Sequence, residues 1–477
     1  MATCLYAGII SATEEDAIKL PELGSSSDQY MTPLDEVKLG KEFMMSVRRT
    51  GTVEDDPLLS EYIENLGNKL QKQSDASGLA CHFFIIDQPD INAFAGPGCH
   101  IGINSGLILA TQSESELASV IAHELAHITQ KHLLRAFEAA NEVSGKTAAL
   151  LLASILVGVA GSPDAGIAMA TGVQANAIQE QINFTRSNEK EADTVGIRIL
   201  ARSEFDPRAM PVFFERLTHA SRLYESGIPE ILRTHPVTTN RIADALGRAE
   251  EYAYRQYPGN LSYFLTREAL RFGSYKESDK AVKYFATGLA EGRHLNQEAH
   301  EYGYVLALTA NREFDKAQTI IERLLKAYPE QPEFVLASAQ IYQDRGEHAQ
   351  AIKLLDTYFS LMPDNYPIAL SYIEALTTSR KLEKARSIAQ QTLELHANDP
   401  TLYRRLSKIE EMDGHQAESH RLLAEAYIID GALRSAVNQL EIALGEAEKS
   451  DFYLVSKIES RLKKLQETLK SAEADEL

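Results

Sequence analysis

Residues 120–128 read Val-Ile-Ala-His-Glu-Leu-Ala-His-Ile, and they decide how the rest of the chain is interpreted. Two histidines four residues apart on a helix project from one face, so His123 and His127 can bind one Zn²⁺ ion. Glu124 lies on the adjacent arc, where a carboxylate can take a proton from water at the metal. The apolar neighbours favour this reading over histidine and glutamate on a solvated face. We therefore expect a zinc-dependent endopeptidase with Glu124 as its catalytic base.

A catalytic zinc site needs a third protein ligand and an open coordination position. The motif HExxHxxGxxH is absent from the sequence, since residues 128–133 read ITQKHL. His132 lies five residues past His127, and we expect it on the surface, away from the metal. The third ligand must therefore come from another element of the fold.

The segment 184–200, FTRSNEKEADTVGIRIL, is predicted to be a helix that supplies this ligand. Glu189 and Asp193 are four residues apart and share a face of that helix, whereas Glu191 points away. Glu189 as the zinc ligand, with Asp193 accepting the N–H of a ligand histidine, would complete the catalytic site. Pairing of Glu189 with Arg186 on a solvated helix is the alternative that the spacing leaves open.

The region before the zinc motif mixes helical and strand patterns. Apolar spacing predicts a helix over 57–73, and a short β-rich run predicts a strand over 82–86. Two β-capable segments within 92–109 flank a Gly-Pro-Gly turn, which is typical of a hairpin. A Ser-x-x-Glu capping box at Ser113 predicts the start of the helix that carries residues 115–137.

The second half of the chain carries an internal repeat. Ala317, Ala351 and Ala385 recur every 34 residues, the period of a tetratricopeptide repeat, over the units spanning about 298–400. Beyond residue 400 the pattern weakens. Stacked helix pairs of this kind form a concave groove for extended peptides or partner helices, so we expect protein binding rather than a purely structural dimerisation arm.

Together these patterns predict three segments. Residues 1–28 form a residual signal sequence and linker, and residues 29–257 an α+β zincin-like metallopeptidase domain, mostly helical with a small sheet. Residues 258–477 form an all-α tetratricopeptide repeat solenoid. The formal net charge of −20 argues against a nucleic-acid partner, because little could neutralise the phosphates.

Three further features bear on the cell compartment. Residues 4–12 resemble the end of a secretory signal that lacks its charged beginning. The apolar run 147–160 is too short to span a bilayer, so we favour a buried helical hairpin over 147–176 and at most peripheral membrane contact. Cys81 and Cys99 could form one disulfide in an oxidising compartment or remain two free thiols.

The segments AHELAH and RSNEKEAD resemble the zinc peptidase family that includes the heat-shock protease HtpX and the CAAX prenyl endoprotease. The resemblance implies that Glu189 is the third ligand of a single zinc ion per chain. The segment 92–108 resembles the family's hairpin, whose strand lies beside the active-site cleft. We therefore expect a strand edge there to bind an extended substrate, through Asn92, Ala93, Phe94 and Ala95.

His235 precedes Pro236, which biases it away from helix and onto a loop. In the family members that this chain resembles, a histidine at this place can occupy the open zinc position. We therefore consider His235 as an inhibitory fourth ligand, although a transition-state, substrate-binding or plain loop histidine is also possible. Arg241 could contact an aspartate or bind substrate carbonyls.

The layout of the whole chain resembles periplasmic members of this family that carry C-terminal repeats. This resemblance implies quality control of unfolded or stalled outer-membrane β-barrel proteins, or help with their assembly, in the periplasm of a Gram-negative bacterium. It also implies that the repeats contact the barrel-assembly machinery. The alternative is a chaperone or adaptor with a latent protease site.

Overall fold

The computed structural model describes residues 32–49, 52–135, 175–223, 229–257, 259–448 and 451–475. Two sequence predictions concern segments beyond these residues. The truncated signal at residues 4–12 and the apolar run at 147–160, with nearly all of the proposed hairpin 147–176, lie outside the described residues and stay predictions.

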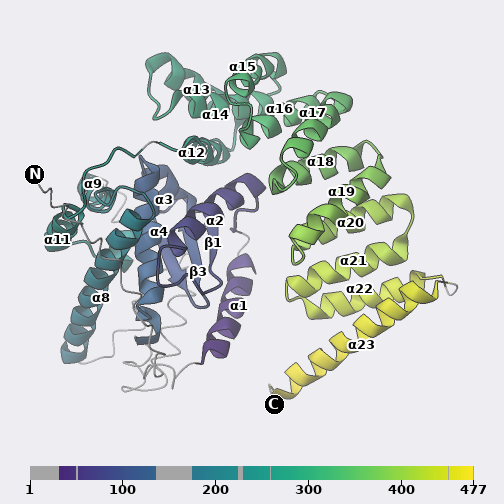
Figure 1. The fold of residues 1–477 in the computed structure, drawn as a ribbon, viewed down its shortest axis with the longest axis horizontal. Coiled ribbons are helices and arrows are strands. Elements are labelled where there is room, and N and C mark those ends of the chain that lie inside the picture. The colour runs from purple at the N-terminus through teal and green to yellow at the C-terminus, as the bar shows by residue number, and fades with distance from the viewer. Residues whose placement is uncertain are drawn as a thin grey trace, which may run out of the picture.

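A small three-stranded sheet lies beside two N-terminal helices, α1 (Pro33–Arg49) and α2 (Pro57–Gln71) (Figure 1). The strand order is β1-β3-β2: β1 (His82–Ile86) runs parallel to β3 (His100–Asn104), and β2 (Ala93–Gly96) runs antiparallel to β3. The predicted strand and hairpin are thus confirmed. Strand β2 stands at the edge of this sheet, so within the described residues no strand lies beside its outer backbone groups.

The second strand of the hairpin ends at Asn104. The last residues of the segment 92–109 form a short helix, α3 (Ser105–Ala110). Leu107 and Ile108 are adjacent in sequence and both fully buried, a pattern that a half-exposed strand cannot produce because its side chains alternate between faces. A short apolar run does not distinguish a buried helix from a strand.

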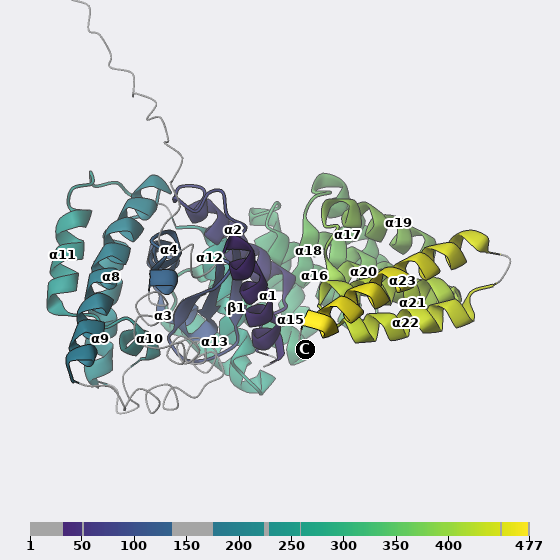
Figure 2. The ribbon, with the colours of Figure 1, turned by 90° about the horizontal axis from the view of Figure 1, so that it is seen from below.

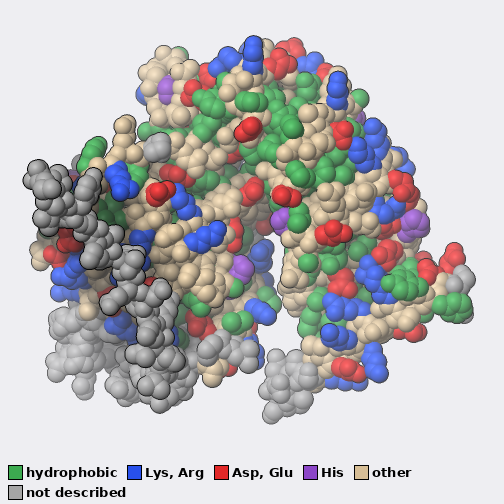
Figure 3. All heavy atoms as spheres, viewed as in Figure 1, with side chains coloured by type: hydrophobic (Ala, Val, Ile, Leu, Met, Phe, Trp, Pro, Cys, Tyr) green, Lys and Arg blue, Asp and Glu red, His purple; other side chains and the backbone are tan. Residues whose placement is uncertain are grey.

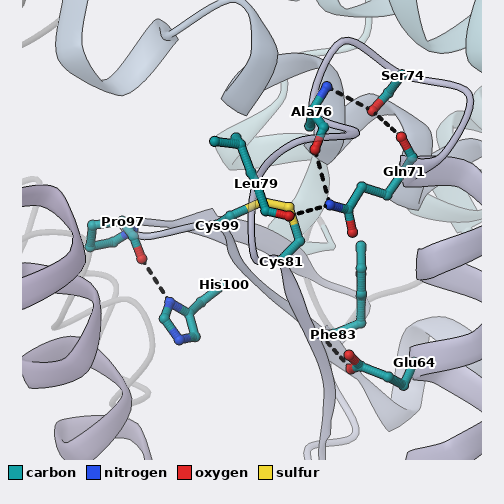
Figure 4. The surroundings of a disulfide bond; sticks show 10 residues. All are labelled: Glu64, Gln71, Ser74, Ala76, Leu79, Cys81, Phe83, Pro97, Cys99 and His100. Carbon is teal, nitrogen blue, oxygen red and sulfur yellow. Dashed lines mark hydrogen bonds between the residues drawn. A yellow bond between two sulfur atoms is a disulfide. The ribbon is translucent and has the colours of Figure 1, made fainter. Parts of the chain in front are cut away.

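A disulfide joins Cys81 to Cys99 at the start of strands β1 and β3 (Figure 4). Cys99 has a φ of 59°, in the left-handed region that favours glycine. The loop before Cys81 is held by Gln71, whose Nε2 donates to the carbonyls of Ala76 at 3.0 Å and Leu79 at 2.7 Å. The disulfide and the loop before Cys81 together hold the starts of β1 and β3 in place.

The helix that carries the zinc motif is α4 (Glu114–Thr129). As predicted, Ser113 caps it, its Oγ accepting the N–H of Glu116 at 3.3 Å. The expected continuation to residue 137 is wrong, because Lys131 adopts a φ of 52° and breaks the helix. A separate helical turn begins at His132, so this histidine is not part of α4.

Helix α8 (Ala175–Arg202) lies alongside α4 in both ribbon views (Figures 1 and 2). Gly196 allows this close approach. A Cβ atom there would lie 3.3 Å from the backbone nitrogen of His123 and 3.4 Å from the backbone carbon of Ala122. Of the helices that follow, α9 (Ala209–Leu223) packs against α4, and α11 (Thr239–Ala249) packs against α8 and α9. Helix α10 (Glu230–Thr234) lies between α9 and α11 in the sequence.

The predicted repeat array is confirmed as a series of helix pairs that curves beside the N-terminal region (Figure 1). Ala317, Ala351 and Ala385 are all fully buried, as the 34-residue period requires. The helices are α12 (Leu261–Gly273), α13 (Ser278–Glu291), α14 (Gln297–Ala310), α15 (Phe314–Ala327), α16 (Pro332–Asp344), α17 (His348–Leu361), α18 (Tyr366–Thr378), α19 (Leu382–Leu395), α20 (Pro400–Asp413), α21 (Gln416–Ile429), α22 (Leu433–Glu446) and α23 (Phe452–Asp475).

The turn inside each of four successive units contains one left-handed residue, and these residues also recur every 34 positions. They are Arg312, Gly346, Arg380 and Gly414, with φ values of 61°, 77°, 54° and 88°. The fourth of them lies beyond residue 400. The backbone repeat therefore continues where the sequence pattern weakens.

Helix α12 joins the two parts of the chain. The Tyr263 hydroxyl lies 2.9 Å from Thr111 Oγ1, and Arg267 donates to the carbonyls of Leu109 at 2.9 Å and Thr111 at 3.2 Å. These contacts hold α12 against the residues that lead into α4. The far end of the array returns toward α1, and Figure 3 shows the surface hollowed between α1 and helices α20 to α22.

We predict that Gly196→Val lowers the free energy of unfolding by about 1–3 kcal/mol, because the new side chain forces α8 away from α4. The matched control is Gly247→Val, at an exposed helix position where an added Cβ would meet no neighbouring atom within 4 Å. This control should change stability by less than about 0.5 kcal/mol. Chemical denaturation of the two variants makes the comparison, and equal stabilities would contradict the close-approach argument.

Candidate active site

Helices α4 and α8 bring together three side chains that could bind a metal ion. His123 Nε2 lies 3.1 Å from His127 Nε2 and 3.3 Å from Glu189 Oε2, and His127 Nε2 lies 3.4 Å from Glu189 Oε1. Ligand atoms about 2.0–2.1 Å from a tetrahedral zinc lie about 3.3–3.4 Å from one another. The observed separations therefore fit the edges of a zinc tetrahedron.

Asp193 lies behind the first of these histidines. Its Oδ1 is 3.1 Å from His123 Nδ1, the nitrogen that does not face the other ligands. A histidine that binds metal through one nitrogen commonly donates its other N–H to such a carboxylate. The alternative in which Glu189 pairs with Arg186 on a solvated helix is wrong, because Glu189 is 3% exposed and its oxygens face the histidines and Arg241.

Arg241 on α11 supports both carboxylates of this site. Its Nε and Nη2 donate to the two oxygens of Asp193, each at 2.8 Å, and its Nη1 lies 2.8 Å from Glu189 Oε2. Nη1 also donates to the Pro236 carbonyl at 2.9 Å. Of the two possibilities that the sequence left open, the structure places Arg241 on an aspartate. Its buried guanidinium is turned to these carboxylates.

His235 follows α10 directly and enters the same cluster. Its Nδ1 is 3.0 Å from Glu189 Oε1 and 3.4 Å from His123 Nε2, while its Nε2 is 3.6 Å from Glu124 Oε1. One atom from each of His123, His127, Glu189 and His235 lies within 4.8 Å of the others. Four side chains can thus face one metal ion, which is one more than a catalytic zinc site uses.

Glu124 points toward His235 from the face of α4. Its side chain is only 2% exposed. Within the described part of the chain, its Oε1 accepts no hydrogen bond. A buried carboxylate oxygen without a donor is costly unless water or a substrate group meets it. The position between Glu124 and the ligand atoms is the one that His235 occupies.

The charges of the cluster balance one another. Burial lowers the pKa of His123, but hydrogen bonds to Asp193 and Glu189 outweigh it and raise that pKa to about 10. Burial raises the pKa of Glu189, yet His235 and His123 hold it well below its usual range. Burial, with His123 as the next cause, keeps the pKa of His127 well below its usual range. Glu189 is therefore ionised and can accept a divalent cation.

His132 is the site residue that sequence reasoning missed. It was expected on the surface, and this prediction is wrong: it is 5% exposed, and its Nδ1 lies 2.8 Å from His127 Nδ1. On a continuous helix, a residue five positions past His127 would point elsewhere. The left-handed Lys131 redirects it, and no pattern in the sequence marks that residue as a helix break.

The expected substrate strand lies next to the site. Strand β2 packs beside α4, and no described strand pairs with its outer edge. Asn92 and Ala93 are buried, whereas Phe94 and Ala95 are half-buried. The carbonyl of Ile91, just before this strand, accepts the N–H of Ile231 in α10 at 3.1 Å. The structure does not test substrate binding at these positions, and it stays a prediction.

Comparison with known proteins now adds to the geometry. Residues 57–249 match peptidase family M48, and residues 342–409 match a tetratricopeptide repeat. The chain is 31% identical over 441 residues to the beta-barrel assembly-enhancing protease of Escherichia coli K12, covering 92% of this chain and 90% of that protein. This chain belongs to that protease family. It is an M48 metallopeptidase with a C-terminal tetratricopeptide repeat region.

Further relatives agree with this assignment to family M48. A Vibrio cholerae member is 36% identical over 421 residues, which cover 88% of this chain and 86% of that protein. The mitochondrial metalloendopeptidase OMA1 of Arabidopsis thaliana is 27% identical over 218 residues, which cover 45% of this chain and 41% of that protein. Among the residues that the structure describes, no helix has both the length and the apolar composition to cross a membrane.

We predict that Arg241→Met lowers the free energy of unfolding by about 3–5 kcal/mol, because it leaves two buried carboxylates without their cation. Arg248→Met, on the same helix, is the control and should change stability by less than about 0.5 kcal/mol. Denaturant unfolding measures both. Unchanged stability together with a raised KM would instead support the substrate-binding role expected from the sequence.

Proposed function

We propose that this M48 metallopeptidase is a zinc endopeptidase of the bacterial periplasm that acts on unfolded or stalled outer-membrane β-barrel proteins. One zinc ion per chain is held by His123, His127 and Glu189. The observation that carries the zinc assignment is the cluster of two imidazole nitrogens and a carboxylate with tetrahedral spacing. The donor set matches the two histidines and one glutamate of known catalytic zinc sites.

Each residue of the cluster has a distinct task in peptide hydrolysis. When bound, zinc supplies Lewis acidity and lowers the pKa of coordinated water to about 7. Glu124 accepts the proton of the attacking water and returns it to the amine that leaves. Asp193 holds the His123 ring in the tautomer that presents Nε2, and Arg241 holds Asp193 in place. The buried setting strengthens these charge interactions.

The position of His235 supports a latent state. Its ring fills the space between Glu124 and Glu189 and faces His123, where an attacking water would have to sit. In our proposal, His235 is an inhibitory fourth ligand that must move out before the peptidase can act. This arrangement is also what favours the second candidate function, a chaperone or adaptor in which the protease site stays latent.

Substrate recognition is assigned to two surfaces. A substrate in extended conformation adds a strand to the outer edge of β2 and contacts Asn92, Ala93, Phe94 and Ala95. This pairing directs the scissile bond of the substrate past α4. The repeats bind the unfolded substrate or the barrel-assembly machinery. This proposal divides the chain into a peptidase domain of residues 29–257 and a repeat domain of residues 258–477.

Two observations support the periplasm as the compartment and β-barrel proteins as substrates. The disulfide between Cys81 and Cys99 suits an oxidising compartment. The names of the relatives that span most of the chain refer to enhanced β-barrel assembly.

The first test compares the parent protein with Glu124→Gln, both loaded with zinc, in cleavage of an unfolded outer-membrane β-barrel protein. We expect the variant to lose about 10²–10⁴-fold in kcat, because the proton acceptor is gone while the ligands remain. Metal analysis should find one zinc per chain in both proteins. If neither protein cleaves while both bind the unfolded chain equally, the adaptor function replaces the peptidase function.

The second test removes the inhibitory ligand. His235→Ala should raise the cleavage rate about tenfold or more, because an open state hidden by a dominant closed state is populated at about 10% or less. His219→Ala serves as the control, since His219 lies exposed on α9 and contacts only Glu215 among the described ion pairs. An unchanged rate would remove the switch, and a lower rate would make His235 a participant in catalysis.

A further inference from the structure

The second ligand histidine has a support of its own outside the zinc tetrahedron. His127 Nδ1 lies 2.8 Å from His132 Nδ1, and His132 Nε2 lies 3.2 Å from Glu191 Oε2. His132 is 5% exposed and reaches this position only because the chain turns at Lys131. The three side chains therefore form a continuous line from the metal site to the surface of α8.

The direction of hydrogen bonding along this line follows from the ligand role of His127. If its Nε2 lone pair is directed at the metal, its proton must reside on Nδ1, which then donates to His132. His132 Nδ1 accepts, so in the neutral ring the proton of His132 resides on Nε2. That N–H donates to the carboxylate of Glu191, and every contact in the line is satisfied.

Arg135 holds Glu191 at the surface end of this line, and Asn188 in turn holds Arg135. Arg135 Nη1 donates to Glu191 Oε2 at 3.0 Å, and its Nη2 donates to Asn188 Oδ1 at 3.3 Å. The Glu191 side chain is 39% exposed, so its charge stays partly hydrated. A carboxylate placed directly against His127 would have been a further buried charge beside Glu189 and Asp193, which is costly.

The two ligand histidines are thus held in parallel ways. Asp193 lies 3.1 Å from His123 Nδ1 and is braced by Arg241, while Glu191 reaches His127 through the His132 ring and is braced by Arg135. We propose that His132 is a positioning residue for the metal site. It fixes the tautomer and ring orientation of His127 and so increases the affinity of the site for zinc. This inference rests on the proposed zinc peptidase function.

The test measures zinc affinity by competition with a chelator of known affinity. His132→Phe keeps a ring but removes the acceptor, so the dissociation constant for zinc should rise about tenfold or more. His132→Asn places a side-chain oxygen near the position of Nδ1, and we expect affinity within about threefold of the parent value. The visible spectrum of the cobalt-substituted proteins should report the same order, because it depends on ligand geometry.

Two further variants keep the test sharp. Lys190→Met, on the same helix but in an exposed pair with Asp244, is the matched control and should leave zinc affinity unchanged. Glu191→Gln keeps the inference testable if His132→Phe does not fold, and it should weaken zinc binding about threefold or more. Thermal unfolding without zinc shows which variants are folded before their affinities are compared.

The outcomes separate this inference from the function on which it rests. Weak binding by His132→Phe with rescue by His132→Asn supports the positioning role. A folded His132→Phe that binds zinc as tightly as the parent protein overturns it, and so does a His132→Asn variant as weak as His132→Phe. A parent protein that binds no zinc overturns the proposed function itself.

Discussion

The close packing of α4 against α8 is the constraint on which the peptidase site depends. Gly196 lets the two helix backbones approach at the first turn of the zinc motif. That approach brings the Glu189 carboxylate to within 3.4 Å of both ligand histidines. A wider spacing would separate the ligand atoms beyond the edge length of a zinc tetrahedron, whatever the residues were. The site is therefore a property of a helix interface, and its ligands come from both sides.

The interface between α4 and α8 also buries several charged side chains away from water. Glu189, Asp193 and Glu124 are all less than 5% exposed. Burying carboxylates costs free energy unless each meets a donor or a cation. Arg241 serves two of them with three nitrogen atoms, while Glu124 is left facing His235. Among the described residues, Glu124 Oε1 accepts no hydrogen bond, and Glu124 is the carboxylate that we propose as the proton acceptor in hydrolysis.

The sequence predicted those parts of the molecule that a short period or spacing determines. The i, i+4 histidines, the Glu189–Asp193 pair and the 34-residue repeat each depend on helix geometry alone, and the structure places them as expected. The helix at Ser105–Ala110 and the break at Lys131 could not be predicted, because burial and one left-handed residue decide them. His132 was misplaced for that reason. The partner that the Arg241 side chain contacts depends on tertiary packing, and the spacing of residues in the sequence gives no information on that packing.

The junction between the peptidase region and the repeats is made by one helix that belongs to both cores. Helix α12 contributes Tyr263 and Leu270 to the core of the peptidase region and Leu265 to the core of the first repeats. Its Tyr263 and Arg267 hold Thr111, two residues before the cap of α4. The same helix therefore ties the position of the first repeats to the residues that lead into α4.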